Sequence, residues 1–115
     1  MPSPVGPYRS HVRAENFVFC SGQIGLASDG TLKDGFLEQF RQAMVNLESV
    51  LTEAGAGLGN VVKTTVFLVD ADHFSAMNEA YANCFASSLP ARSCVIVKEL
   101  PKGALVEIEA VAHLG

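Results

Sequence analysis

Residues 61–69 have the sequence Val61-Val62-Lys63-Thr64-Thr65-Val66-Phe67-Leu68-Val69. β-Branched and aromatic side chains dominate this segment, and such side chains favour extended strands. The segment is long enough for a central strand of a sheet. The segments on either side of it have the periodicity of helices, so this strand and its two neighbours decide the predicted fold class.

An amphipathic helix is predicted before the strand. Its apolar residues recur at steps of three and four along the chain, at Leu37, Phe40, Met44, Leu47 and Leu51. Asp34 is the candidate cap of its first turn, and Gly55 is the first of three closely spaced glycines that end it.

A second helix is predicted after the strand. Asp70 or Asp72 is its candidate cap, and Leu89-Pro90 ends it. One face of this helix carries the apolar residues Phe74, Met77, Tyr81, Cys84 and Phe85.

The remaining segments supply further strands. After a proline-containing lead-in over residues 1–10, Phe17-Val18-Phe19-Cys20 begins a strand that continues to Gly25. Gly22 within it suggests a bulge or the close approach of another group. Residues 91–98 and 104–113 are the last two strands. The order is strands, helix, strand, helix, strand, strand, which is typical of an α+β fold with two helices on one face of a mixed sheet.

The composition bounds the size and association of the protein. The chain has 115 residues, which we interpret as a single domain over residues 1–115. It is 49% hydrophobic and only 17% charged. One small core cannot cover all of that apolar surface, and the second face of the sheet has no helix to cover it. We therefore expect an oligomer.

Charge and cysteine content exclude several classes of protein. Eight basic and twelve acidic residues give a net charge of −4, and the basic residues are scattered, which argues against a nucleic-acid binder. No apolar stretch is long enough to span a membrane, and no leader is apparent. Cys20, Cys84 and Cys94 have no Cys-x-x-Cys spacing, so we expect reduced thiols in a cytoplasmic protein. Nor do the histidines have metal-ligand spacing.

Two predicted strands contain charged residues among apolar ones. Alternation places Arg92, with Cys94, on one face of its strand, and places Glu107 and Glu109 together on one face of the last strand. Buried charges need compensation. Arg92 could pair with either glutamate as a structural salt bridge, or all three could face water. Alternatively, Arg92 could hold an anionic ligand while a glutamate transfers protons beside it, because a guanidinium matches a carboxylate in a bidentate way.

Three other residues have ordinary structural explanations that compete with a functional one. Tyr8 follows Gly6-Pro7 in a turn, where it could simply pack against the surface. Asn78 lies one position away from the apolar face of its helix, where a surface residue is expected. Cys94 could be a small buried apolar residue.

Together these segments resemble the RidA/YjgF family of small trimeric deaminases, whose proteins are also described as endoribonuclease L-PSP. The matching segments are Gly6-Pro7-Tyr8, Ser21-Gly22-Gln23-Ile24, Val61-Val62-Lys63-Thr64-Thr65-Val66-Phe67, Asn78-Glu79-Ala80-Tyr81, Pro90-Ala91-Arg92-Ser93-Cys94, Leu100-Pro101-Lys102 and Glu107-Ile108-Glu109-Ala110-Val111-Ala112. They occur in the family's order and extend from residue 6 to residue 112.

The resemblance implies a fold, an assembly and a reaction. The fold is similar to that of chorismate mutase, and three subunits close their open sheet faces into a central barrel, with ligands bound in clefts between subunits. The implied reaction is hydrolysis of short-lived enamine and imine acids, such as 2-aminoacrylate and 2-iminobutanoate, to 2-oxo acids and ammonia. It needs no cofactor and no metal.

The resemblance also implies roles for individual residues. Arg92 would hold the substrate carboxylate, and Glu107 would deprotonate the attacking water. Tyr8 would be a third catalytic residue and would also line the pocket, together with Ser21, Gly22, Asn78, Ser93 and Cys94.

This chain departs from the family's usual sequence at one motif, and two alternative functions remain open. The family usually continues Ser-Gln-Ala after Gly-Pro-Tyr, whereas this chain has Arg9-Ser10-His11. The alternative functions are a non-catalytic, chaperone-like protein that binds 2-oxo acids in the same cleft, and a ribonuclease or translation inhibitor. The acidic net charge weighs against the second.

Overall fold

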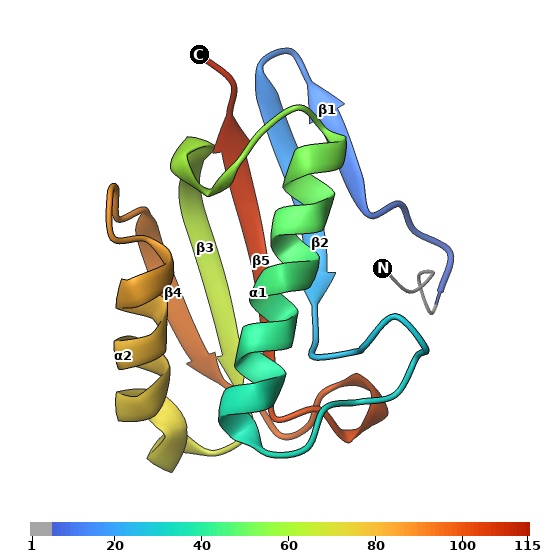
Figure 1. Ribbon diagram of the computed structural model, residues 1–115, viewed down its shortest axis with the longest axis vertical. Helices are drawn as coiled ribbons and strands as arrows, with labels where there is room; N and C mark the ends of the chain where they lie inside the picture. The colour runs from blue at the N-terminus through green and yellow to red at the C-terminus, as the bar shows by residue number, and fades with distance from the viewer. Residues whose placement is uncertain (1–5) are drawn as a thin grey trace.

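The computed structural model describes residues 6–115 as a mixed sheet with two helices packed on one of its faces (Figure 1). The strands are β1 (His11–Ala14), β2 (Phe17–Gln23), β3 (Val61–Leu68), β4 (Ala91–Ile96) and β5 (Val106–His113), and the helices are α1 (Phe36–Glu53) and α2 (Phe74–Cys84). The predicted α+β architecture is confirmed.

The strands are arranged in the order β1-β2-β5-β3-β4. β5 pairs antiparallel with both β2 and β3, while β3 and β4 are parallel and are connected through α2. The last strand of the chain therefore lies in the middle of the sheet, and β4 lies at one edge. This topology gives Glu107 of β5 and Arg92 of β4 very different surroundings.

The core lies between the helices and the sheet, and α1 supplies much of it. Phe40, Met44, Leu47 and Leu51 are buried as the spacing predicts. Leu37 is 41% exposed, however, because the apolar face of the helix begins at Phe36 instead.

The start of α1 also differs from the prediction. Gly35, with φ of 84°, precedes the helix, and no side chain caps it. The prediction that Asp34 caps this helix is therefore wrong. Gly55 follows the helix in a left-handed conformation, which favours glycine and ends the helix as predicted.

The second helix begins later and ends earlier than its sequence indicates. The Asp70 carboxylate accepts a hydrogen bond from the Asp72 backbone and caps a short 3₁₀ turn, Ala71–His73, that leads into α2. The helix ends at Cys84, before the predicted break at Leu89-Pro90. Met77, Tyr81 and Phe85 are buried as predicted, but Phe74 is 41% exposed.

The residue pattern also missed the edge strand β1, which forms a hairpin with β2. The four residues of β1 are mostly exposed, so they lack the alternation of buried and exposed side chains that identifies a strand. The predicted lead-in over residues 1–10 lies partly outside the described residues.

One face of the sheet carries no helix. Val106, Ile108 and Ala110 of β5 are buried beneath the helices, and Glu107 and Glu109 point to the opposite face, as their alternation predicts. Phe17 and Phe19 of β2 lie on this open face and are largely exposed, because the residue between them, Val18, is buried on the helix side.

Candidate active site

Arg92 of β4 lies against aromatic side chains of α2, and we call this part of the molecule the Arg92 region. Its guanidinium carbon is 4.9 Å from the centroid of the Tyr81 ring and 5.8 Å from that of the Phe74 ring. Arg92 Nη1 also donates a long hydrogen bond to Met77 Sδ, at 3.7 Å. A thioether is a weak acceptor. Across residues 6–115, no carboxylate lies within ion-pair distance of this half-buried cation.

Tyr81 is itself held in place. Its hydroxyl shares a 2.6 Å hydrogen bond with the hydroxyl of Thr64, a fully buried residue of β3. Thr64 is also the strand neighbour of Arg92 in the parallel β3–β4 pair. Burial raises the pKa of the Tyr81 phenol, so this ring is a neutral hydrogen-bonding partner at physiological pH.

Two further candidate residues belong to the Arg92 region. Cys94 is half-buried, two residues after Arg92 and therefore on the same face of β4. Burial raises the pKa of its thiol, although the Arg92 charge opposes this effect, so Cys94 is an unactivated thiol. Asn78 follows Met77 on α2, and its side-chain oxygen is buried without a hydrogen bond from any described residue.

Glu107 lies on the open face of the sheet, where β5 meets β2. We call this the Glu107 region. The structure explains Gly22: a side chain at that position would overlap the Glu107 carboxylate, and the ladder between β2 and β5 shifts register there. The predicted close approach at Gly22 is confirmed. Burial raises the pKa of the Glu107 carboxyl, and the neighbouring Glu109 charge raises it further.

The segment that carries Tyr8 is attached beside Gly22. The Ser21 hydroxyl donates a 2.6 Å hydrogen bond to the Arg9 carbonyl, and the Ser21 backbone donates to the Ser10 carbonyl. Tyr8, 46% exposed, stands at the end of this segment. Tyr8, Ser21, Gly22 and Glu107 therefore belong to one part of the molecule.

The described chain does not bring Arg92 and Glu107 together. Arg92 faces Thr64 of β3 and Glu107 faces Phe67, so the two lie on different sides of β3 and three residues apart along it. Standard strand spacing places their Cα atoms about 14 Å apart. Arg92 also points to the helix side of the sheet and Glu107 to the open side. The interpretation that Arg92 forms a structural salt bridge with Glu107 or Glu109 is therefore wrong for the residues that the structure describes.

Ser93 belongs to neither region of the site within one subunit. It is exposed, its side chain lies on the opposite face of β4 from Arg92, and its hydroxyl accepts a 2.9 Å hydrogen bond from Lys63 Nζ. The structure therefore separates Ser93 from the two residues that flank it in sequence.

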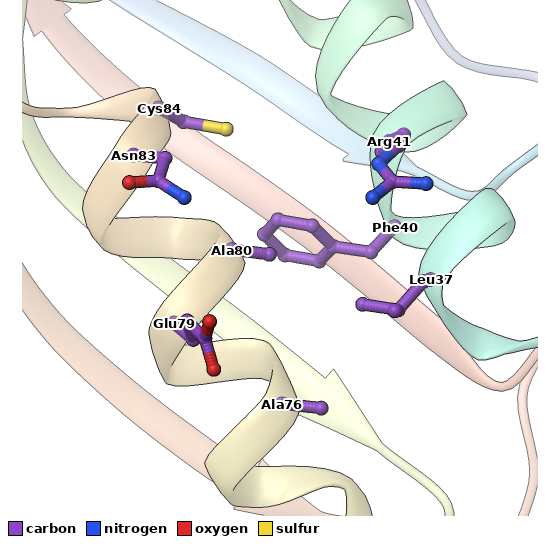
Figure 2. A pocket seen from close by; sticks show the side chains of 8 residues that line it. All are labelled: Leu37, Phe40, Arg41, Ala76, Glu79, Ala80, Asn83 and Cys84. Atoms are coloured by element: carbon purple, nitrogen blue, oxygen red, sulfur yellow. The ribbon is translucent and has the colours of Figure 1, made fainter.

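A separate pocket of about 290 Å³ lies between α1 and α2. Figure 2 shows the Phe40 ring extending from α1 towards Ala80 of α2, with Glu79 and Cys84 along the same side of α2. None of the residues predicted for the active site lines this pocket. Its cation, Arg41, is paired with Glu38 of the same helix at 2.6 Å. The pocket is therefore distinct from the candidate site.

The part of the chain that the structure describes contains neither a candidate metal site nor a helix that could span a membrane. Within residues 6–115, no three His, Cys, Asp or Glu side chains gather closely enough to bind a metal ion. In the same range, neither helix is both long and apolar enough to cross a membrane.

Sequence reasoning missed the residues that surround Arg92. The spacing of Phe74, Met77 and Tyr81 is that of an apolar helix face, which predicts a role in the core alone. The signal that could have identified them is the parallel pairing of β3 with β4, which places an arginine beneath the connecting helix.

Comparison with known sequences shows that almost the whole chain matches the model of one protein family. The family model described as Endoribonuclease L-PSP matches residues 1–114. A mouse protein named 2-iminobutanoate/2-iminopropanoate deaminase is 43% identical over 116 residues, covering 99% of this chain and 86% of the mouse protein.

Solved structures agree with this result. The crystal structure of RidA from the Antarctic bacterium Psychrobacter has a TM-score of 0.95 at 37% identity, covering 97% of this chain and 92% of that one. The crystal structure of the YjgF gene product of E. coli has a TM-score of 0.93, also at 37% identity, covering 97% and 91% of the two chains.

Proposed function

This chain belongs to the endoribonuclease L-PSP family, which includes RidA and YjgF, and from that premise we propose that it is an enamine/imine deaminase. Its substrates would be 2-imino acids such as 2-iminopropanoate and 2-iminobutanoate, together with their enamine forms. The observation that carries the proposal is the state of its two charged strand residues. Arg92 and Glu107 are both half-buried, and neither forms an ion pair with any residue that the structure describes.

The Arg92 region suits the carboxylate of such a substrate. Within the described residues, this half-buried guanidinium has no carboxylate partner, so its donors are available, and two of them match the two oxygens of a carboxylate. Lysine offers no such planar pair of donors. Cys94 and Asn78, which lie close to Arg92 in the fold, would line the same part of the pocket together with the Ser93 backbone.

The Glu107 region suits proton transfer. Hydrolysis of the imine adds water across the C=N bond and then expels ammonia. Water attacks the carbon of the protonated imine, and its proton moves to the Glu107 carboxylate as the C–O bond forms, giving a carbinolamine. Glu107 passes this proton to the amine nitrogen, and as the C–N bond breaks and ammonia leaves, the hydroxyl proton moves to the Glu107 carboxylate and the C=O bond forms. Glu107 then gives that proton to the released ammonia, which leaves as ammonium. The raised pKa of Glu107 brings this base closer to neutral pH, where proton transfer is more efficient. Such a base contributes about 10²–10⁴-fold.

The separation of the two regions favours a site built by two subunits. We propose a homotrimer in which the open sheet faces form a central barrel, similar to that of chorismate mutase, with sites in the clefts between subunits. Exposed Phe17 and Phe19 on the helix-free face support burial of that face. Arg92 of one subunit would then meet Tyr8, Ser21, Gly22 and Glu107 of the next. The reaction needs no cofactor.

The proposal is tested in a coupled assay. A pyridoxal-phosphate dehydratase acting on serine or threonine generates the imine, and ammonia release is followed with and without the protein. We expect the wild-type protein to accelerate release and Arg92→Ala to abolish the acceleration. Arg41→Ala, which removes the exposed arginine paired with Glu38 away from both regions, is the matched control and should remain active.

The remaining outcomes separate the competing functions. If wild-type protein gives no acceleration but binds 2-oxobutyrate in calorimetry, the protein is a binding protein and not a deaminase. RNA cleavage that persists in an Arg92→Ala/Glu107→Gln double variant would instead support the ribonuclease function. Light scattering should give three times the mass of one chain, and a monomeric mass would contradict the inter-subunit site.

A further inference from the structure

The surroundings of Arg92 are unusual for a half-buried cation. Its partners are two aromatic rings and a sulfur atom, and no described carboxylate or carbonyl accepts a hydrogen bond from it. The shorter ring contact is with Tyr81, at 4.9 Å. A guanidinium near an aromatic face is attracted to the ring electrons without using its N–H donors.

We propose that Tyr81, fixed by its hydrogen bond to Thr64 and assisted by Phe74, is a positioning residue that holds the Arg92 guanidinium through ring contacts and leaves its N–H edge available for a substrate carboxylate. This inference rests on the proposed function, because it assumes that Arg92 binds the substrate. It adds that the orientation of the guanidinium depends on α2, although the arginine itself belongs to β4.

The way in which Arg92 is held determines how many of its donors remain for the substrate. A carboxylate partner would accept hydrogen bonds from two of the five N–H groups of Arg92 and would compete with the substrate for the same pair of donors. A ring takes none of them. The cradle of Tyr81 and Phe74 therefore restrains a long, flexible side chain without occupying the group that binds.

The contact between Tyr81 and Thr64 fixes the position of the cradle. Thr64 is fully buried and is the β3 neighbour of Arg92, so the same strand residue lies beside the arginine and anchors the ring that holds it. A displacement of Tyr81 would change the direction of the guanidinium without altering Glu107, which lies on the other face of the sheet. The inference therefore predicts an effect on binding and not on chemistry.

The experiment measures the dissociation constant of 2-oxobutyrate by calorimetry, and kcat and KM in the coupled assay. We expect Tyr81→Leu to weaken binding and raise KM by about 3- to 30-fold, with kcat little changed. Tyr81→Phe retains the ring and should recover most of the affinity. Phe74→Leu changes a partly exposed residue, tests the second ring without loss of folding, and should raise KM by about 2- to 5-fold.

The matched control is Phe40→Leu, which truncates a fully buried ring on α1 that does not contact Arg92. It should lower the melting temperature and leave KM unchanged. If Tyr81→Leu and Phe74→Leu bind like the wild type, or if Phe40→Leu raises KM equally, the positioning role is wrong. The wild-type protein and Arg92→Ala distinguish this failure from that of the proposed function. Only failure of the proposed function leaves the wild-type protein without acceleration, or leaves Arg92→Ala as active as the wild type.

Discussion

The Arg92 region and the Glu107 region accommodate charges of opposite sign in one sheet, and they do so in different ways. In the Arg92 region, a cation at the edge strand β4 is held by rings and a thioether beneath a helix. In the Glu107 region, an anion on the central strand β5 lies in space that Gly22 leaves empty, on the face without helices. Neither charge is neutralised by the other.

The two charged groups differ in what surrounds them. The arginine is surrounded by large side chains that add contacts but no charge. The glutamate has room for its carboxylate because Gly22 has no side chain, and its pKa is raised by burial and, to a smaller extent, by the neighbouring Glu109 charge. A salt bridge within one chain would satisfy both groups and would leave neither for a substrate.

The largest expected effect comes from testing whether the two regions act across subunits. Glu107→Gln should lower activity by about 10²–10⁴-fold, the contribution of a general base, and Arg92→Ala should abolish the acceleration. When the two inactive variants are co-expressed and purified as mixed trimers, about one site in four combines an intact Arg92 with an intact Glu107, so about a quarter of wild-type activity should return.

In the control experiment, the two variants are purified separately and then mixed under conditions in which subunits do not exchange. This mixture should recover no activity. If co-expression also restores nothing although mixed trimers are present, the two regions do not share a site.

A smaller effect is expected from filling the space at Gly22. In Gly22→Ala, the added carbon overlaps the end of the Glu107 side chain, which can move aside, so the fold should persist while the base is displaced. A displacement of about 1 Å can cost about 10²-fold in rate, and we expect a loss in kcat of that order with little change in melting temperature.

Gly57→Ala is the matched control for Gly22→Ala. Gly57 has an extended backbone, and an added side chain would meet nothing within 4 Å. Equal losses for the two variants would show that Gly22 does not act through Glu107.

The smallest effect concerns pH. In the proposed mechanism, Glu107 acts as a base only when ionised, so activity is expected to fall as the pH drops through its pKa. Burial raises that pKa and the Glu109 charge raises it further, so Glu109→Gln should lower it and move the acidic limb of the kcat profile to lower pH. Activity near neutral pH should change little. Glu53→Gln, at the exposed end of α1, should leave the profile where it is, and an upward shift in Glu109→Gln would contradict the assignment.

The order of elements and the faces of the strands could be predicted from the sequence. Alternation alone places Glu107 and Glu109 opposite Val106 and Ile108, because strand periodicity is a local property. The ends of the helices were harder to predict. Gly35, not Asp34, precedes α1, because the capping residue depends on the direction in which the chain enters the helix.

The relation between Arg92 and Glu107 could not be predicted in the same way. It depends on the position of β5 between β2 and β3, and on the parallel register of β3 with β4, which no local pattern specifies. The aromatic cradle was missed for the same reason. A helix face that contacts the core and a helix face that contacts a cation have the same periodicity in sequence.

The location of Arg92 and Glu107 on opposite faces of one sheet has a genetic consequence. In the proposed ring of three, each chain contributes to two different sites. A chain that has lost both groups therefore disables two of the three sites when it joins two intact chains. In a cell that makes intact and defective chains equally, about a quarter of the sites remain whole, compared with about half for sites contained within one chain. Defective alleles should accordingly be partly dominant.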